Sequence, residues 1–162
     1  MSPVAPDQAP SPPSSPASAS GLSSRANSKP VIAVVGLSNC PVRASYDVAA
    51  YMQAAGYRIV AVNPMYAGQI ILGERCHASL HEASAALAAE GLRISIVDCF
   101  RKSSDIPPVV EEAIAIHAEC IWMQLDIINE PAAARARAAG LQVIMDKCIK
   151  IEHRLGNTLG VL

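Results

Sequence analysis

Residues 31–64 decide the fold of this chain, and they read VIAVVGLSNCPVRASYDVAAYMQAAGYRIVAVNP. The stretch opens with Val31–Val35, a short, continuous and mostly β-branched run that ends at Gly36. Such a run is typical of a strand buried on both faces of a parallel sheet. A second run of this kind, Arg58–Val62, ends at Asn63-Pro64, where the proline disfavours continuation of regular structure. Two strands of one parallel sheet are therefore predicted.

The rest of the chain continues this alternation of strands and helices. Three further strands are predicted over residues 94–98, 120–123 and 141–145. Helices are predicted over 45–55 (with Ser45 as N-cap), 80–89, 107–117, 129–140 and 149–154, and 67–79 is expected to be a loop. Five strands joined by helices imply right-handed crossovers. We therefore predict an α/β fold of three layers with a five-stranded parallel sheet, and a ligand at the carboxyl ends of its strands.

Composition divides the chain into a tail and one domain. Residues 1–30 contain nine Ser, seven Pro and five Ala, so they cannot bury enough apolar surface to offset the entropy of ordering. We predict a disordered tail over 1–30, a folded domain over 31–155 and a flexible end over 156–162. The domain is large enough for one hydrophobic core, because 51% of the whole chain is hydrophobic.

Charge and cysteine usage exclude several classes of protein. The net charge is −1 and no run of Lys or Arg occurs, which disfavours a nucleic-acid partner. The five cysteines are scattered without metal-ligand spacing, so no metal site is predicted and a reducing, cytoplasmic location is expected. No apolar run approaches the roughly 20 residues of a membrane span, so no membrane partner is expected.

The loop after the first strand has features of a phosphate site. Gly36 allows a tight turn into a helix, whose amino end attracts anions, and Arg43 adds a charge that suits phosphate oxygens. The dinucleotide-binding fingerprint is absent, because Ser38 and Pro41 stand where its second and third glycines would be. A purely structural turn with a solvated arginine explains the same residues, and the sequence leaves both interpretations open.

The other strand ends carry further candidates. Asn63 and Pro64 follow the second strand, where nicotinamide-binding domains usually have an acidic residue. Without a carboxylate, a ribose that carries its own phosphate meets no repulsion there. Arg101 and Lys102 follow the third strand and could offset phosphate charge, although solvated surface charge is the simpler explanation of these residues taken alone. Asn-Pro is likewise a common turn.

The fourth strand ends with an apolar wall and an amide, Trp122 and Gln124, which suit an arm of apolar carbons interrupted by amides. A core tryptophan is the simpler explanation of Trp122. For catalysis, Asp98 and Asp146 lie at strand ends, and one of them could act as a general base. Cys40 lies in the first loop. No pattern pairs a nucleophile with a base, so catalysis is not expected.

Four stretches of the chain resemble the stand-alone coenzyme A-binding domain family, which is related to the nucleotide domain of the succinyl-CoA synthetase alpha subunit. They are VVGLSNCPVRASYDVAAYMQAAGYRIVAVNP (34–64), ILGERCHASL (71–80), VDCFRKSSDIPPVVEEAI (97–114) and WMQLDIINEPAAARARAAGLQVIMDKCIKIEHRL (122–155). The resemblance implies a Rossmann-type fold, coenzyme A or an acyl-CoA as ligand, and no established catalysis.

Carried over to this chain, the resemblance implies a set of binding residues. Gly36, Ser38, Arg43 and Ser45 would hold the phosphates; Asn63 and Pro64 would shape the adenosine pocket; Arg101 and Lys102 would meet phosphate or ribose; Trp122, Gln124 and Asn129 would border the pantetheine. The chain departs from the family at Asp126, where glycine is common, and at His77 and Ser104.

The expected function is thus non-catalytic binding of coenzyme A or an acyl-CoA. Two alternatives remain at this point. One is a small NAD(P)- or acyl-CoA-dependent enzyme, and the other is a regulatory partner protein with a vestigial pocket, for which Asp126 would be the reason. The sequence leaves the oligomeric state open, a homo-oligomer included.

Overall fold

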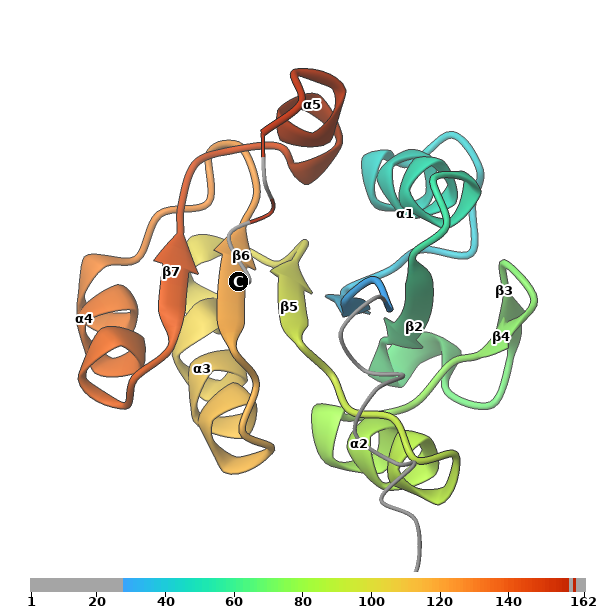
Figure 1. The fold of residues 1–162 in the computed structure, drawn as a ribbon, viewed down its shortest axis with the longest axis horizontal. Helices are drawn as coiled ribbons and strands as arrows, with labels where there is room; N and C mark the ends of the chain where they lie inside the picture. Colours follow the sequence, from blue (N-terminus) through green and yellow to red (C-terminus); the bar gives the residue numbers. More distant parts are fainter. Residues whose placement is uncertain (1–27, 158, 160–162) are drawn as a thin grey trace, which may run out of the picture.

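A parallel five-stranded sheet forms the centre of the computed structural model, which describes residues 28–157 and 159 (Figure 1). Its strands stand in the order β2-β1-β5-β6-β7. They comprise β1 (Val31–Val35), β2 (Arg58–Val62), β5 (Ile96–Cys99), β6 (Cys120–Met123) and β7 (Gln142–Ile144). The predicted Rossmann-type parallel sheet is confirmed. The predicted tail lies outside the described residues except for its last three, and so does most of the predicted flexible end.

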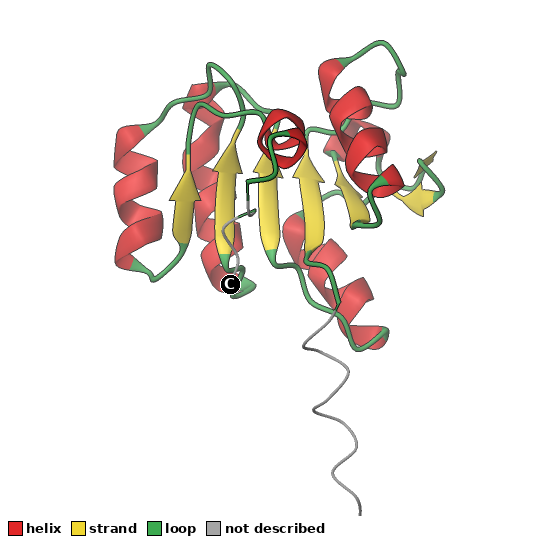
Figure 2. Ribbon diagram, turned by 45° about the horizontal axis from the view of Figure 1, so that its top comes forward, coloured by secondary structure: helices red, strands yellow, loops and turns green. Residues whose placement is uncertain are grey.

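Helices cover both faces of the sheet and complete the three layers (Figure 2). They are α1 (Ala44–Ala54), α2 (Leu80–Ala89), α3 (Ile106–Ala115), α4 (Glu130–Ala138) and α5 (Ile149–Arg154), with short 3-10 turns η1 (Pro64–Tyr66) and η2 (Ser103–Asp105). One hydrophobic cluster packs α2, α3 and α4 against the sheet, and a second cluster packs α1 and α5 against the opposite face. None of the described helices has the length and apolar character of a membrane span.

The central strand shows why the short apolar runs form strands. All five residues of β1 are buried, and successive side chains point to opposite faces. Ala33 and Val35 belong to the cluster under α2, α3 and α4, whereas Ile32 and Val34 belong to the cluster under α1 and α5. A strand between two helix layers needs apolar residues at every position, which is the pattern that the sequence shows.

The start of α1 differs from the prediction. Ser45 was predicted to cap this helix, but the N-cap is Arg43, and no side chain caps the helix there. Ser45 is the second helical residue and is buried, and its Oγ accepts a hydrogen bond from the Ser38 N–H at 3.0 Å. The hydroxyl therefore stabilises the preceding loop instead of the first turn of its own helix.

The predicted loop over 67–79 is also wrong in part, because it contains an antiparallel hairpin of β3 (Ile70–Ile71) and β4 (Glu74–Arg75). Leu72 and Gly73 form its turn with φ of 52° and 77°, as two-residue hairpin turns require. Leucine rarely adopts positive φ, so the sequence lacks the usual Asn-Gly or Asp-Gly signal of such a turn.

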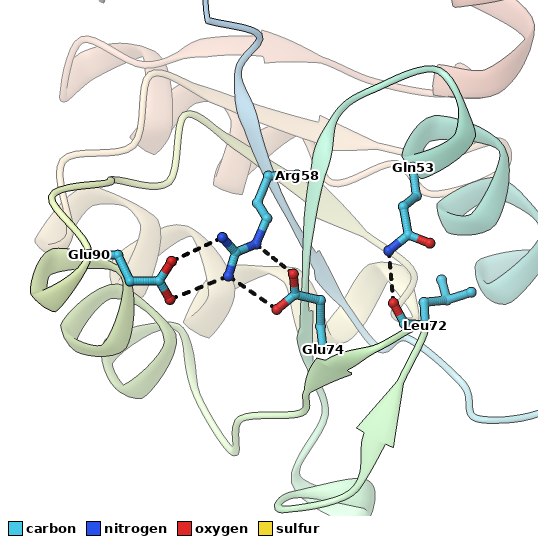
Figure 3. Close-up of polar contacts among 5 residues, drawn as sticks. All are labelled: Gln53, Arg58, Leu72, Glu74 and Glu90. Atoms are coloured by element: carbon cyan, nitrogen blue, oxygen red, sulfur yellow. Dashed lines mark hydrogen bonds and ion pairs between the residues drawn. The ribbon is translucent and has the colours of Figure 1, made fainter.

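Polar contacts attach this hairpin to three neighbouring elements (Figure 3). Gln53 of α1 donates to the Leu72 carbonyl at 2.8 Å. Arg58 of β2 forms ion pairs with Glu74 of β4 at 2.6 Å and with Glu90, at the end of α2, at 3.0 Å. These contacts hold the hairpin beside β2, an edge strand of the sheet, at the amino end of that strand, because Arg58 is its first residue.

Candidate functional site

The candidate site lies at the carboxyl edge of the sheet, where the direction of the connections reverses. From β1 the chain leads into α1 on one face, and from the adjacent β5 it leads into α3 on the other face. In open parallel sheets, ligands bind at this switch point. The three strand ends are held together by backbone bonds from Gly36 N–H to Val62 O and from Phe100 N–H to Val35 O, both 2.8 Å.

Gly36 is required at this junction for two reasons. Its φ of +90° lies in the region that only glycine adopts readily, and a Cβ at this position would collide with the carbonyl oxygen of Phe100. The turn after β1 therefore passes directly against the chain that follows β5. This close approach fixes the start of the predicted phosphate loop.

Hydrogen bonds within the loop fix the rest of its path. The Ser38 N–H donates to Ser45 Oγ and the Cys40 N–H donates to Ser38 Oγ, each at 3.0 Å. Both predicted serines thus orient loop backbone. Arg43 is exposed beside the first turn of α1, where no side chain occupies the N–H groups. The helix end and Arg43 are positive groups that an anion can approach, while Asp47, the acidic residue of the same turn, is paired with Lys150 of α5 at 2.7 Å.

Asn63 connects the ends of β1 and β2. Its side chain is 6% exposed; Nδ2 donates to the Leu37 carbonyl at 3.1 Å, and Oδ1 accepts from the Met65 N–H at 3.0 Å. The amide therefore satisfies two backbone groups with its two ends. A carboxylate in its place would lose the donor and face a carbonyl oxygen, so the local structure favours an uncharged residue here.

A cavity of about 280 Å³ opens at the ends of β1 and β2, on the α2/α3 face. Its lining is Val35, Val62, Pro64, Ala78, Ser79, Leu80, Arg101, Asp105, Pro108, Val109 and Glu112. The structure thus brings Pro64 and Arg101 together, whereas Lys102 is exposed and is not part of the lining. Valine and proline side chains supply apolar walls, and the charged lining residues are Arg101, Asp105 and Glu112.

The end of β6 contains a buried polar pair that the sequence analysis did not find. Gln124 is 4% exposed, and its Nε2 donates to Asp98 Oδ1 of β5 at 2.5 Å. Burial raises the pKa of the Asp98 carboxyl to about 7, although the Gln124 hydrogen bond lowers it. The two residues are 26 positions apart, so only the pairing of β5 with β6 brings them together.

Trp122 and Asn129 have structural partners near the same strand end. The Trp122 ring is 1% exposed in the α1/α5 cluster, and its Nε1 donates to the Lys147 carbonyl at 2.7 Å. Asn129 caps α4, as predicted, because Oδ1 accepts from the Ala132 N–H at 3.0 Å. Its Nδ2 donates to the Ser103 carbonyl at 2.9 Å and so joins the loops after β5 and β6.

The structure also gives a physical reason why glycine would suit position 126. Asp126 has a φ of 64°, in the left-handed region, and its N–H donates to Asp146 Oδ1 at 2.7 Å. Its side chain is exposed. Asp98 and Asp146, the two carboxylates considered as bases, thus have different partners.

Replacing Asp126 with glycine is expected to raise the free energy of unfolding by about 0.5–1 kcal/mol, because glycine has no Cβ to strain at positive φ. Urea unfolding measures this change. The Asp126→Ala variant is the control, since it also removes the carboxylate but keeps the strain. Equal stability of the two variants would contradict the strain argument.

The fold is that of a parallel α/β domain of the Rossmann type, and its candidate site lies at the carboxyl edge, where domains of this class bind their ligands. A family model described as a CoA binding domain matches residues 30–154, and the chain belongs to this family. Within the described residues, no cluster of three His, Cys, Asp or Glu side chains could hold a metal ion.

Individual relatives extend this comparison. The chain is 41% identical to the uncharacterized protein YneT of Bacillus subtilis (strain 168) over 122 residues, which cover 75% of this chain and 84% of YneT. Among solved structures, it is similar to the cell-free ID.343 protein of Thermus thermophilus, with a TM-score of 0.69 and 30% identity over 78% of this chain and 89% of the other. A hypothetical protein from Pyrococcus horikoshii OT3 gives a TM-score of 0.69 and 32% identity over 76% and 81%.

Proposed function

We propose that this domain binds coenzyme A or an acyl-CoA at the carboxyl edge of its sheet and performs no chemistry on it. Family membership carries the proposal, since it makes coenzyme A the ligand class. The local geometry supports it through Arg43 at the uncapped start of α1, an uncharged Asn63 at the end of β2, and a cavity at the ends of β1 and β2.

The phosphates are proposed to bind between the loop after β1 and the first turn of α1. Gly36, Ser38 and Ser45 set the path of the loop, and Arg43 provides a guanidinium for phosphate oxygens. Because α1 has no side-chain cap, its first N–H groups are available to an anion. The loop thus combines a full positive charge with backbone donors.

The adenosine is proposed to occupy the cavity of about 280 Å³. Apolar walls such as Pro64 and Val109 suit the flat purine, and the guanidinium of Arg101 in the lining suits the phosphate on the ribose. Lys102 would act from the adjacent exposed position. The pantetheine is proposed to run toward the end of β6, where the buried Trp122 lies within the strand and Gln124 and Asn129 follow it.

Binding without catalysis is supported by the structural use of the polar groups at the edge. Asn63 and Asn129 have both ends of their amides bonded to backbone.

All five cysteines are free, as suits a reducing compartment, and we propose a cytoplasmic location.

Replacing Arg43 with alanine is expected to weaken coenzyme A binding by about 1.5–3 kcal/mol, the scale of a lost charge-assisted hydrogen bond. Titration calorimetry measures this loss. Arg137→Ala is the matched control, because Arg137 is equally exposed but lies in the last turn of α4, whose end is at the opposite edge of the sheet. Equal affinities in the two variants would show that Arg43 is only a surface residue.

Native mass spectrometry of the protein after gentle purification tests the ligand class without a prior choice of ligand. The proposal predicts an additional mass equal to coenzyme A or one of its thioesters. A retained nicotinamide dinucleotide would contradict it and would favour the small oxidoreductase instead.

A further inference from the structure

The buried pair of Asp98 and Gln124 lies beside the switch point of the sheet. Asp98 is in β5, opposite Val34 of β1 on one side and Trp122 of β6 on the other. Gln124 follows β6 directly, at the carboxyl edge. Their side chains are 1% and 4% exposed, yet a hydrogen bond of 2.5 Å joins them. A buried hydrogen-bonded pair at a ligand edge fixes the orientation of a polar group there.

The direction of this hydrogen bond determines what Gln124 offers to a ligand. Its Nε2 donates to Asp98, and its Oε1 has no hydrogen-bond partner among the described residues. An ionised carboxylate only accepts hydrogen bonds, so it holds Nε2 inward and leaves the Oε1 acceptor outward. A protonated carboxyl group can donate to Oε1 instead, and the amide can then turn its NH₂ group outward.

We propose that Asp98 is a positioning residue that sets which end of the Gln124 amide faces the bound ligand. This inference rests on the proposed function, because the ligand groups that meet Gln124 are the amides of the pantetheine arm. With Asp98 ionised, the site accepts a hydrogen bond from a pantetheine N–H. With Asp98 protonated, that acceptor is no longer held in place.

Among the described residues, no charged side chain contributes to the shifted pKa of Asp98, whose causes are burial and the Gln124 hydrogen bond. On the elements packed against this face, Asp47 of α1 and Lys150 of α5 are paired with each other at 2.7 Å. Val34 and Trp122 flank it in the sheet, and α1 and α5 bury apolar residues on this face. The titratable side chains affected by its charge are the thiols of Cys99 and Cys120. Burial raises the pKa of Cys120 to about 12 and that of Cys99 well above its usual range, so both stay neutral. The carboxyl group of Asp98, whose pKa burial raises to about 7, thus titrates near neutral pH.

The test is coenzyme A affinity against pH, measured by calorimetry for the natural protein and for Asp98→Asn. The ratio of the two dissociation constants removes the titration of the ligand's own phosphate. From about pH 5.5 to about 8.5, this ratio is expected to shift about fivefold in favour of the natural protein, the scale of one hydrogen bond. Gln124→Met keeps the carboxyl group and removes the amide. When the same Asp98→Asn comparison is made in the Gln124→Met protein, the ratio of dissociation constants should therefore not change with pH.

A constant ratio with measurable binding would overturn the inference and leave the proposed function intact, and a shift that persists in Gln124→Met would overturn it as well. The ¹⁵N signal of the Gln124 side-chain amide gives a readout without ligand. It should move with the same midpoint as the Asp98 carboxyl ¹³C signal, and an amide signal unaffected by pH would contradict the positioning role. Absence of coenzyme A binding at every pH would instead contradict the proposed function.

Discussion

Replacing Gly36 with alanine is expected to lower the free energy of unfolding by about 3 kcal/mol. Two effects add at this position. Alanine is strained at a φ of +90°, and its Cβ would meet the backbone carbonyl of Phe100, which cannot rotate away as a side chain could. Relief of the collision would separate the chain segments after β1 and β5, which the Phe100–Val35 backbone bond holds together.

Gly140→Ala separates the two effects, because Gly140 also has a φ of +90° but has no atom within 4 Å of an added Cβ. Only the strain remains there, so a loss of about 1 kcal/mol is expected. Urea unfolding of both variants provides the comparison. Equal losses would show that the close approach at Gly36 contributes nothing to stability.

The second large effect is a dependence of stability on pH that comes from Asp98. Burial raises the pKa of this carboxyl group from 3.8 to about 7, so the folded protein holds the proton over an interval in which the unfolded chain releases it. The contribution of Asp98 to the free energy of unfolding is therefore largest below about pH 4. It decreases as the pH rises to about 7 and changes no further above that. A difference of about three units corresponds to about 4 kcal/mol.

Asp98→Asn cannot ionise, so the difference in unfolding free energy between the natural protein and this variant isolates the contribution. Other carboxyl groups cancel in the difference. This includes Glu90, whose pKa the Arg58 hydrogen bond lowers. As the pH rises from about 4 to about 7, the free energy of unfolding of the natural protein should fall relative to that of the variant. A constant difference would show that Asp98 keeps an ordinary pKa in the folded protein.

Much of the fold could be predicted because its signals are local. A continuous apolar run such as Val31–Val35 has few alternatives to a buried strand, and Asn129 is followed by proline in the manner of a helix start. The hairpin was missed because Leu72 adopts positive φ without a recognisable turn signal. The role of Ser45 was wrong because its hydroxyl bonds to a residue seven positions earlier, outside its own helix.

The candidate site was predictable to the extent that strand ends meet at one edge. Pro64 and Arg101 follow different strands of one sheet, and they line the same cavity. The pair of Asp98 and Gln124 could not be predicted, since it depends on the strand register and on burial, which turn an acidic residue into a group that titrates near neutral pH. The reason why glycine would suit position 126 likewise becomes visible only from the backbone, because Asp126 has a positive φ.

Side-by-side calorimetric titration with coenzyme A, dephospho-coenzyme A and NAD tests the central claim most directly. Because Asn63 leaves the end of β2 without a carboxylate and Arg101 lines the cavity, coenzyme A should bind more tightly than its dephosphorylated form, and NAD more weakly than coenzyme A. Tighter binding of NAD than of coenzyme A would contradict the account.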